Sequence, residues 1–154
     1  MHRSKLVICI RFQTLKAQTS GSNAVQNEWS IWCRKCELMP DAAGSPGSEK
    51  GVLQYCADND IVFMGHSPLG GLKQRRGERT IGKKKLTCLT AIKERTGCSI
   101  EAAMLACMLH RGQEVGAKVL LIPGARTVAH AVDSVGAARL RLTPQEVAAV
   151  LDVR

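Results

Sequence analysis

The stretch Ile61-Val62-Phe63-Met64-Gly65, followed directly by His66-Ser67-Pro68-Leu69-Gly70-Gly71, decides the fold of this chain. A short apolar run without alternation is typical of a strand that is buried on both faces of a sheet. The proline and glycines that come next end such a strand abruptly. We therefore expect a buried strand here, with a tight turn at its carboxyl end.

Two further segments have the character of strands. Residues 24–29 alternate between apolar and polar side chains, and residues 118–122 form another apolar run, which Pro123 and Gly124 end. Helical patterns occur between and after the strands, at residues 51–59, 86–96, 99–109 and 127–137. Thr143-Pro144-Gln145-Glu146 is a capping box and predicts the start of a last helix.

This order of elements predicts the fold class. Buried strands that alternate with helices indicate an α/β protein with a parallel sheet and right-handed crossovers. Ligands of such sheets bind where the strands end, on the loops that lead into helices. In this chain those loops are residues 29–30, 66–71 and 124–127.

The composition fits one domain with a mostly aliphatic core. The chain has 154 residues, of which 45% are hydrophobic and 3% aromatic, and its formal net charge at pH 7 is +9. Much of this charge lies in the basic loop 73–85, which holds seven Lys or Arg residues and one acid, Glu78. Such a loop suits a polyanion: a nucleic acid, a membrane surface or a phosphorylated cofactor. Nucleic-acid binding stays a minor alternative, because no aromatic residues are interleaved with the basic ones.

The cysteines indicate a reducing, cytoplasmic location. There are seven, an odd number scattered along the chain, and no secretory leader or membrane-spanning run accompanies them. Residues 1–23 carry four basic residues and no acid, so a mitochondrial leader is an alternative for that segment. Cys33-Arg34-Lys35-Cys36 is a single pair, whereas a structural zinc site needs four ligands, so we assign no metal. A redox role is disfavoured too, because no clear strand and helix flank the pair.

Three stretches, in the correct order, resemble the aldo-keto reductase family. They are Val25-Gln26-Asn27-Glu28-Trp29-Ser30, the turn His66-Ser67-Pro68-Leu69-Gly70-Gly71, and Ile122-Pro123-Gly124-Ala125-Arg126. The resemblance covers about Val25 to Leu151 and implies a partial TIM (β/α)8 barrel: the last three β/α units and the C-terminal helix. We expect residues 24–154 to form this partial domain and residues 1–23 to be a separate basic extension.

The family binds a nicotinamide dinucleotide, and the resemblance implies which residues would hold it. Gln26 stands where the family holds the nicotinamide carboxamide, and a side-chain amide can both donate to and accept from such a group. His66 stands where an aromatic residue stacks on the nicotinamide ring. The turn with Ser67, Pro68, Leu69 and Gly70 suits the pyrophosphate, and Lys73 and Arg75 follow it with positive charge.

The resemblance places the adenosine end of the cofactor on the last unit. Gly124 and Arg126 precede a helix, where the family binds the adenosine 2′-phosphate, so NADP(H) is implied rather than NAD. Asp133 and Ser134 stand where relatives commonly have Glu and Asn against the adenine. Asp is one methylene shorter and Ser has no amide, so both substitutions weaken adenine recognition.

The chemistry of the family has no counterpart in this chain. Family members reduce a carbonyl with a tyrosine as general acid, supported by lysine, aspartate and histidine. The only tyrosine is Tyr55, and Lys50 stands where the family's Asp-x-x-x-x-Tyr spacing would need an aspartate. We therefore assign no catalytic residue. We expect NADP(H) binding without turnover by the isolated chain, with an inert fragment as the alternative.

Three strand–helix units cannot close a barrel. Two strand edges then stay open, and Val, Ile and Met side chains of the inner face have no cover. We therefore expect self-association through these edges, or a chain of marginal stability.

Overall fold

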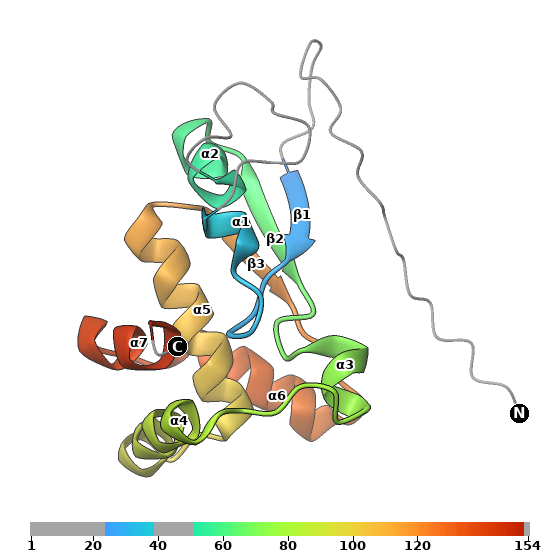
Figure 1. Cartoon of the computed structure of the whole chain (residues 1–154), viewed down its shortest axis with the longest axis vertical. Coiled ribbons are helices and arrows are strands. Elements are labelled where there is room, and N and C mark those ends of the chain that lie inside the picture. The colour runs from blue at the N-terminus through green and yellow to red at the C-terminus, as the bar shows by residue number, and fades with distance from the viewer. Residues whose placement is uncertain (1–23, 39–50, 153–154) are drawn as a thin grey trace, which may run out of the picture.

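Three parallel strands form one sheet in the order β1-β2-β3. The computed structural model (Figure 1) describes residues 24–38 and 51–152. The strands are β1 Ala24–Glu28, β2 Val62–His66 and β3 Val119–Ile122. In their register, Glu28 lies beside His66 and His66 beside Ile122, so all three strands end at the same edge. The predicted α/β organisation with a parallel sheet is therefore confirmed.

The helices follow the predicted order. They are α1 Lys35–Leu38, α2 Val52–Asp58, α3 Gly71–Arg75, α4 Lys83–Thr96, α5 Ile100–Val115, α6 Val128–Gly136 and α7 Pro144–Leu151, and a short 3-10 helix spans Ala137–Arg139. The capping box at the start of α7 is present as predicted.

The sequence pattern did not predict two short helices, and it placed the start of a third helix too late. α1 and α3 are 4 and 5 residues long, which is too short for an apolar periodicity to show. α4 begins at Lys83 instead of residue 86, because its first turn consists of three lysines that carry no apolar signal. The basic loop 73–85 is therefore partly helical.

Helix α5 lies at the centre of the core. Its residues 102–108 are all buried, and α5 contacts α2, α4, α7 and β3. Gly112 allows the close approach to β3, because a Cβ at this position would collide with the side chain of Val119. Next to Gly112, Trp29 packs edge to face against Phe63 with ring centroids 5.4 Å apart.

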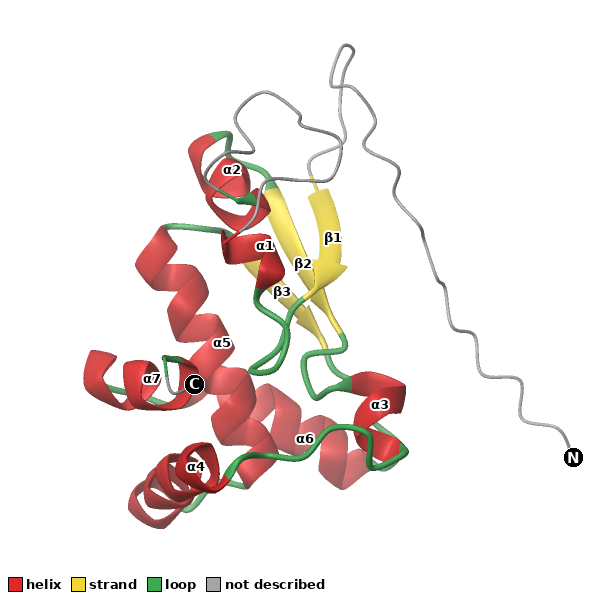
Figure 2. Ribbon diagram, in the orientation of Figure 1, coloured by secondary structure: helices red, strands yellow, loops and turns green. Residues whose placement is uncertain are grey.

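The two faces of the sheet differ in cover. Phe63 and Gly65 of β2 are buried toward α2 and α5, which lie on one side of the sheet in Figure 2. Side chains alternate along a strand, so Val62, Met64 and His66 face the other way, and we call this the open face. On β3 the exposed fractions are 53% for Leu120 and 43% for Ile122. The open face corresponds to the inner face of the predicted partial barrel, which we expected to lack cover.

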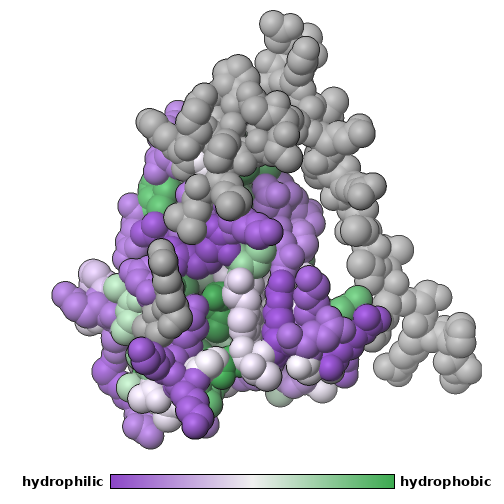
Figure 3. Space-filling view, in the orientation of Figure 1, coloured by the Kyte–Doolittle hydropathy of each residue, from purple (hydrophilic) through white to green (hydrophobic). Residues whose placement is uncertain are grey.

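Helix α6 is amphipathic, yet it buries none of its residues. Val128, Val132 and Val135 form a stripe at helical spacing, and each is at least 65% exposed. Elsewhere the surface visible in Figure 3 is mostly hydrophilic, with hydrophobic residues in small areas. Within the described ranges, no helix is long and apolar enough to cross a bilayer.

Candidate functional site

The loops that the sequence singled out all leave the sheet at its carboxyl edge. Residue 29 follows β1, the turn 66–71 joins β2 to α3, and residues 123–127 join β3 to α6. Figure 1 shows α3 and α6 at this end of the molecule. The structure thus brings the predicted site residues to one end of the sheet, which is where parallel α/β sheets bind ligands.

Gln26 and His66 lie on the same face of the sheet. Gln26 is the central residue of β1; its neighbour Val25 packs against the core, so Gln26 points to the open face. His66 ends β2 on that same face, and its Nδ1 lies 3.2 Å from Ser67 Oγ. Both side chains are half-buried. A flat ring placed over the end of β2 could therefore meet both of them.

The turn after β2 is tight and closed by its own backbone. Ser67, Gly70 and Gly71 have φ values of 54°, 81° and 59°, and the Gly70 N–H donates to the Ser67 carbonyl at 2.9 Å. Glycine suits position 71, because a side chain would be strained at this φ value and its Cβ would lie 2.9 Å from Ser67 Oγ. Pro68 is buried and Leu69 packs against the core. Pro68 and Leu69 therefore anchor the turn, while the Gly70 N–H is already used within it.

Exposed cations flank this turn on two sides. Lys73 of α3 is exposed, and Arg76, which caps α3, is 70% exposed and lies 3.8 Å from Glu78. The side chain of Arg75 lies outside the described part of the chain. Gly124 and Arg126 are exposed in the loop before α6. These positions supply positive charge that could attract an anionic ligand.

Asp133 and Ser134 are occupied by contacts within the protein. Ser99 Oγ donates to Asp133 Oδ2 at 2.6 Å, and Ser134 Oγ donates to the His130 carbonyl at 2.8 Å. The same Ser99 hydroxyl accepts from the Ala102 N–H and so caps α5. The Asp133 bond links α6 to the start of α5, whereas the Ser134 bond lies within α6 itself. Because both side chains already have partners, the predicted adenine contacts are further weakened.

These residues suit some parts of a nicotinamide dinucleotide better than others. The nicotinamide end has an amide and an imidazole on one face, and the phosphate end has a glycine turn with exposed cations nearby. The adenine end offers two side chains that already have partners. The donor set therefore suits the phosphates and the nicotinamide better than the purine.

Sequence reasoning missed a set of contacts that fasten residues 79–85 to the end of β1. Arg79 donates to Glu28 at 2.7 Å, and the Trp32 indole N–H donates to the Thr80 carbonyl at 3.0 Å. Nothing in the basic loop marked Arg79 as different from its neighbours. Glu28 is the acid at the end of β1, but nothing in the sequence pointed from it to Arg79.

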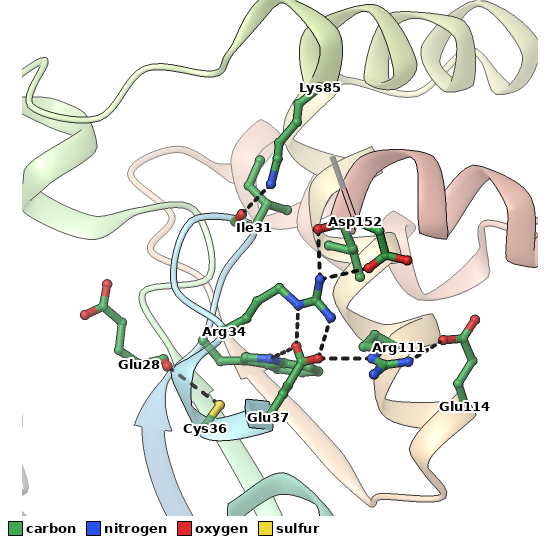
Figure 4. Close-up of polar contacts among 11 residues, drawn as sticks. Glu28, Ile31, Arg34, Cys36, Glu37, Lys85, Arg111, Glu114 and Asp152 are labelled. Atoms are coloured by element: carbon green, nitrogen blue, oxygen red, sulfur yellow. Dashed lines mark hydrogen bonds and ion pairs between the residues drawn. The ribbon is translucent and has the colours of Figure 1, made fainter. Parts of the chain in front are cut away.

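Sequence reasoning also missed a buried polar cluster around Glu37 (Figure 4). Its carboxylate is 2% exposed and accepts from Arg34 at 2.8 and 2.6 Å, from Trp29 at 2.8 Å and from Arg111 at 3.1 Å. Burial alone would raise the pKa of Glu37, but the hydrogen bonds from these donors outweigh burial and leave the pKa lowered. This cluster joins the end of β1 to α5.

The two cysteines of the Cys33–Cys36 pair lie in different elements. β1 ends at Glu28 and α1 begins at Lys35, so Cys33 precedes α1 and Cys36 lies within it. Burial and the nearby charge of Glu37 raise the pKa of Cys36 to about 12, which keeps this thiol protonated. Among the residues that the structure describes, no group of three or more His, Cys, Asp or Glu side chains is placed to hold a metal ion.

The fold defines a class: three β/α units of a parallel barrel, with the candidate site at the carboxyl edge of the sheet. A sequence model of the aldo/keto reductase family matches residues 11–154. The chain therefore belongs to the aldo/keto reductase family. The matched range begins upstream of Ala24, inside the segment that sequence reasoning set apart, and the boundary at residue 24 stays a prediction.

A solved structure supports the same fold. The chain is similar to a thermostable aldo-keto reductase, Tm1743, crystallised with the inhibitor epalrestat, with 24% sequence identity and a TM-score of 0.62. The alignment covers 84% of this chain and 39% of that chain. This chain thus spans well under half of the length of that enzyme, and the predicted partial barrel fold is confirmed.

Proposed function

We propose that this chain supplies the NADP(H)-binding face of an aldo-keto reductase barrel and does not reduce carbonyl compounds by itself. The observation that carries the proposal is the convergence of Gln26, His66, the 67–71 turn and Arg126 at one end of the sheet. Family membership supports a nicotinamide cofactor and, for a complete barrel, a small carbonyl substrate. The exposed Arg126 supports NADP(H) over NAD.

The absence of turnover rests on the residues of this sequence. Tyr55 lies on α2, which follows the first strand and leads into the amino end of β2, so it is remote from the carboxyl edge that carries the ligand face. The family's tyrosine acts as a proton donor with the help of a neighbouring lysine, aspartate and histidine, and this sequence offers no match for that set. An inert chain that binds neither cofactor is the second candidate, favoured by the internal bonds of Asp133 and Ser134.

The direct test is a titration of the chain with NADPH and with NADH, followed by calorimetry, beside an assay of carbonyl reduction. We expect NADPH to bind more tightly than NADH and no turnover. Arg126→Gln should weaken NADPH binding and leave NADH binding nearly unchanged, because only NADPH carries the 2′-phosphate. Turnover by the isolated chain would refute the second half of the proposal, and no binding of either nucleotide would refute the first.

We further propose that the chain associates with itself through surfaces that a complete barrel would cover. Within the described strands, β1 and β3 each pair with β2 only, so each has an open edge. Leu120 and Ile122 beside one edge, and the valine stripe of α6 that follows, are exposed. Unpaired edges with apolar neighbours favour association.

A reducing, cytoplasmic location is also proposed. The six cysteines of the described residues are all free thiols, which supports a compartment that keeps thiols reduced. Proteolytic mapping of the N-terminus in fractionated cells would distinguish this location from import into mitochondria, because import removes a leader.

A further inference from the structure

Three side-chain contacts fasten the segment 79–85 to the segment 28–32. Arg79 bonds Glu28 at 2.7 Å, the Trp32 indole N–H bonds the Thr80 carbonyl at 3.0 Å, and Lys85 Nζ donates to the Ile31 carbonyl at 3.1 Å. Figure 4 shows the last of these contacts. The two segments are about fifty residues apart in the sequence. The contacts between them fix the path of residues 76–82 relative to the end of β1.

Arg79 differs from the other basic residues around it. Its side chain is 16% exposed and that of Glu28 is 33% exposed, whereas the side chain of Arg76 is 70% exposed. A partly buried ion pair is screened less by salt than one on the surface. Arg79 therefore acts as the anchor of this segment. Lys73 and Arg76 before it, and Lys83 and Lys84 after it, remain exposed.

The anchor lies within the candidate site. Glu28 is two residues after Gln26, so both side chains point to the open face, and Glu28 is in register with His66. Trp32 also touches the turn after β2, because a Cβ at Gly70 would lie 3.1 Å from the Trp32 ring. The ion pair thus connects the segment 76–82 to the strand residues of the proposed nicotinamide site. The indole connects the same segment to the turn proposed for the cofactor phosphates.

We propose that Arg79 is a positioning residue for the cofactor phosphates. Through Glu28 it holds the segment 76–82 across the carboxyl end of β1 before any ligand arrives, so that the exposed Arg76 of this segment needs no ordering when the dinucleotide binds. Ordering a loop on binding weakens affinity, and a loop that is already fastened avoids this loss. The inference rests on the proposed NADP(H) binding.

The first measurement needs no cofactor. Trypsin cleaves after Arg76 and Arg79, and Glu28→Gln leaves both cleavage sites intact while it removes the ion pair. We expect cleavage within residues 76–82 to become about fivefold faster, as expected when a modest ion pair is lost. The matched control is Arg95→Gln, which removes an arginine from another 2.7 Å pair, with Glu146, remote from the strand ends. It should leave cleavage of this segment unchanged.

The second measurement is NADPH affinity by calorimetry. Glu28→Gln should weaken binding by about the same factor of five. The charge-swapped double variant Glu28→Arg with Arg79→Glu should restore affinity, and it should return cleavage after Arg76, the site that both chains retain, to the wild-type rate. Unchanged cleavage in Glu28→Gln, or faster cleavage with equal or tighter NADPH binding, would overturn the proposal. If the wild-type chain binds no nucleotide, the proposed function fails and the positioning role with it. The cleavage data would still show whether the ion pair fastens the segment.

Discussion

The carboxylate of Glu37 holds together parts of the chain that are distant in sequence. It accepts hydrogen bonds from the end of β1, from the turn before α1 and from α5, and Arg34 extends the cluster to the Leu151 carbonyl of α7 at 2.8 Å. The Glu37 hydrogen bonds raise the pKa of Arg34. A buried charge of this kind is tolerated only because each partner neutralises the other.

Glu37→Gln should therefore destabilise the fold strongly. The substitution leaves Arg34, which is 16% exposed, with only the exposed Asp152 at 3.3 Å as a counter-charge among the described residues, and we expect a loss of about 3 kcal/mol in the free energy of unfolding. Denaturant titration followed by tryptophan fluorescence measures this loss. The control is Glu114→Gln, which breaks a more exposed pair with Arg111 and should cost less than about 1 kcal/mol. Equal effects of the two substitutions would contradict the role of the cluster.

The acid dependence of stability provides a second check of the same residue. The pKa of Glu37 is lower in the folded chain than its ordinary value of about 4.3, so the folded state binds this proton less readily. The stabilisation is present above about pH 4.3 and is lost as pH falls through the lowered value. Between pH 5 and pH 3 the wild-type chain should lose more stability than Glu37→Gln does.

At the scale of elements, Ser99 connects two helices through one hydroxyl. It caps α5 by accepting from the Ala102 N–H at 2.9 Å, and it donates to Asp133 of α6 at 2.6 Å. Because α6 buries none of its residues, this bond matters more to α6 than to α5, which is buried along much of its length.

Ser99→Ala should loosen α6 selectively. We expect a loss of about 1 kcal/mol from the missing cap and faster hydrogen exchange of the α6 amides. Thr143→Ala is the matched control, because it removes the cap of α7 at a similar cost and has no bond to α6. Amide exchange measured by mass spectrometry separates the two variants. Equal exchange of α6 in both would show that the Asp133 contact contributes nothing.

The elements that the sequence predicted well are those with a strong pattern. The apolar strand 61–65 and the capping box at Thr143 depend on neighbouring residues only, and the structure contains both within a residue of the prediction. α1 and α3 escaped prediction because a single turn of helix is set by tertiary contacts, such as those of Glu37.

The candidate site, like the fold, was predictable only in part. The carboxyl ends of parallel strands must meet at one edge, so sequence alone could bring the Gln26, His66 and Arg126 regions together. It could not foresee that Ser99 would bond Asp133 or that Arg79 would bond Glu28, because these pairs are 34 and 51 residues apart. Contacts of this kind depend on how helices and loops pack, which no local pattern encodes.

At the scale of the whole molecule, the open sheet edges and the α6 stripe should make the oligomeric state of the chain depend on its concentration. We expect sedimentation velocity to show association at micromolar concentrations. Val132→Lys, at a position 65% exposed, should shift the chain toward monomer without loss of fold. Lys93→Glu on exposed α4 serves as a control for a changed surface charge away from the stripe. A monodisperse wild-type monomer with a sharp thermal transition would refute the proposed association.

The Arg34 contact with the Leu151 carbonyl has a consequence for how the chain folds during synthesis. The two residues are 117 positions apart, and α7 packs on both α4 and α5. Until Leu151 has emerged from the ribosome, the Arg34 guanidinium lacks its contacts with Leu151 and Asp152, and the side of α4 and α5 that α7 covers is exposed to solvent. During that interval a nascent chain presents apolar surface that chaperones recognise. Helix α7 therefore closes the core after every strand of the described sheet has been made.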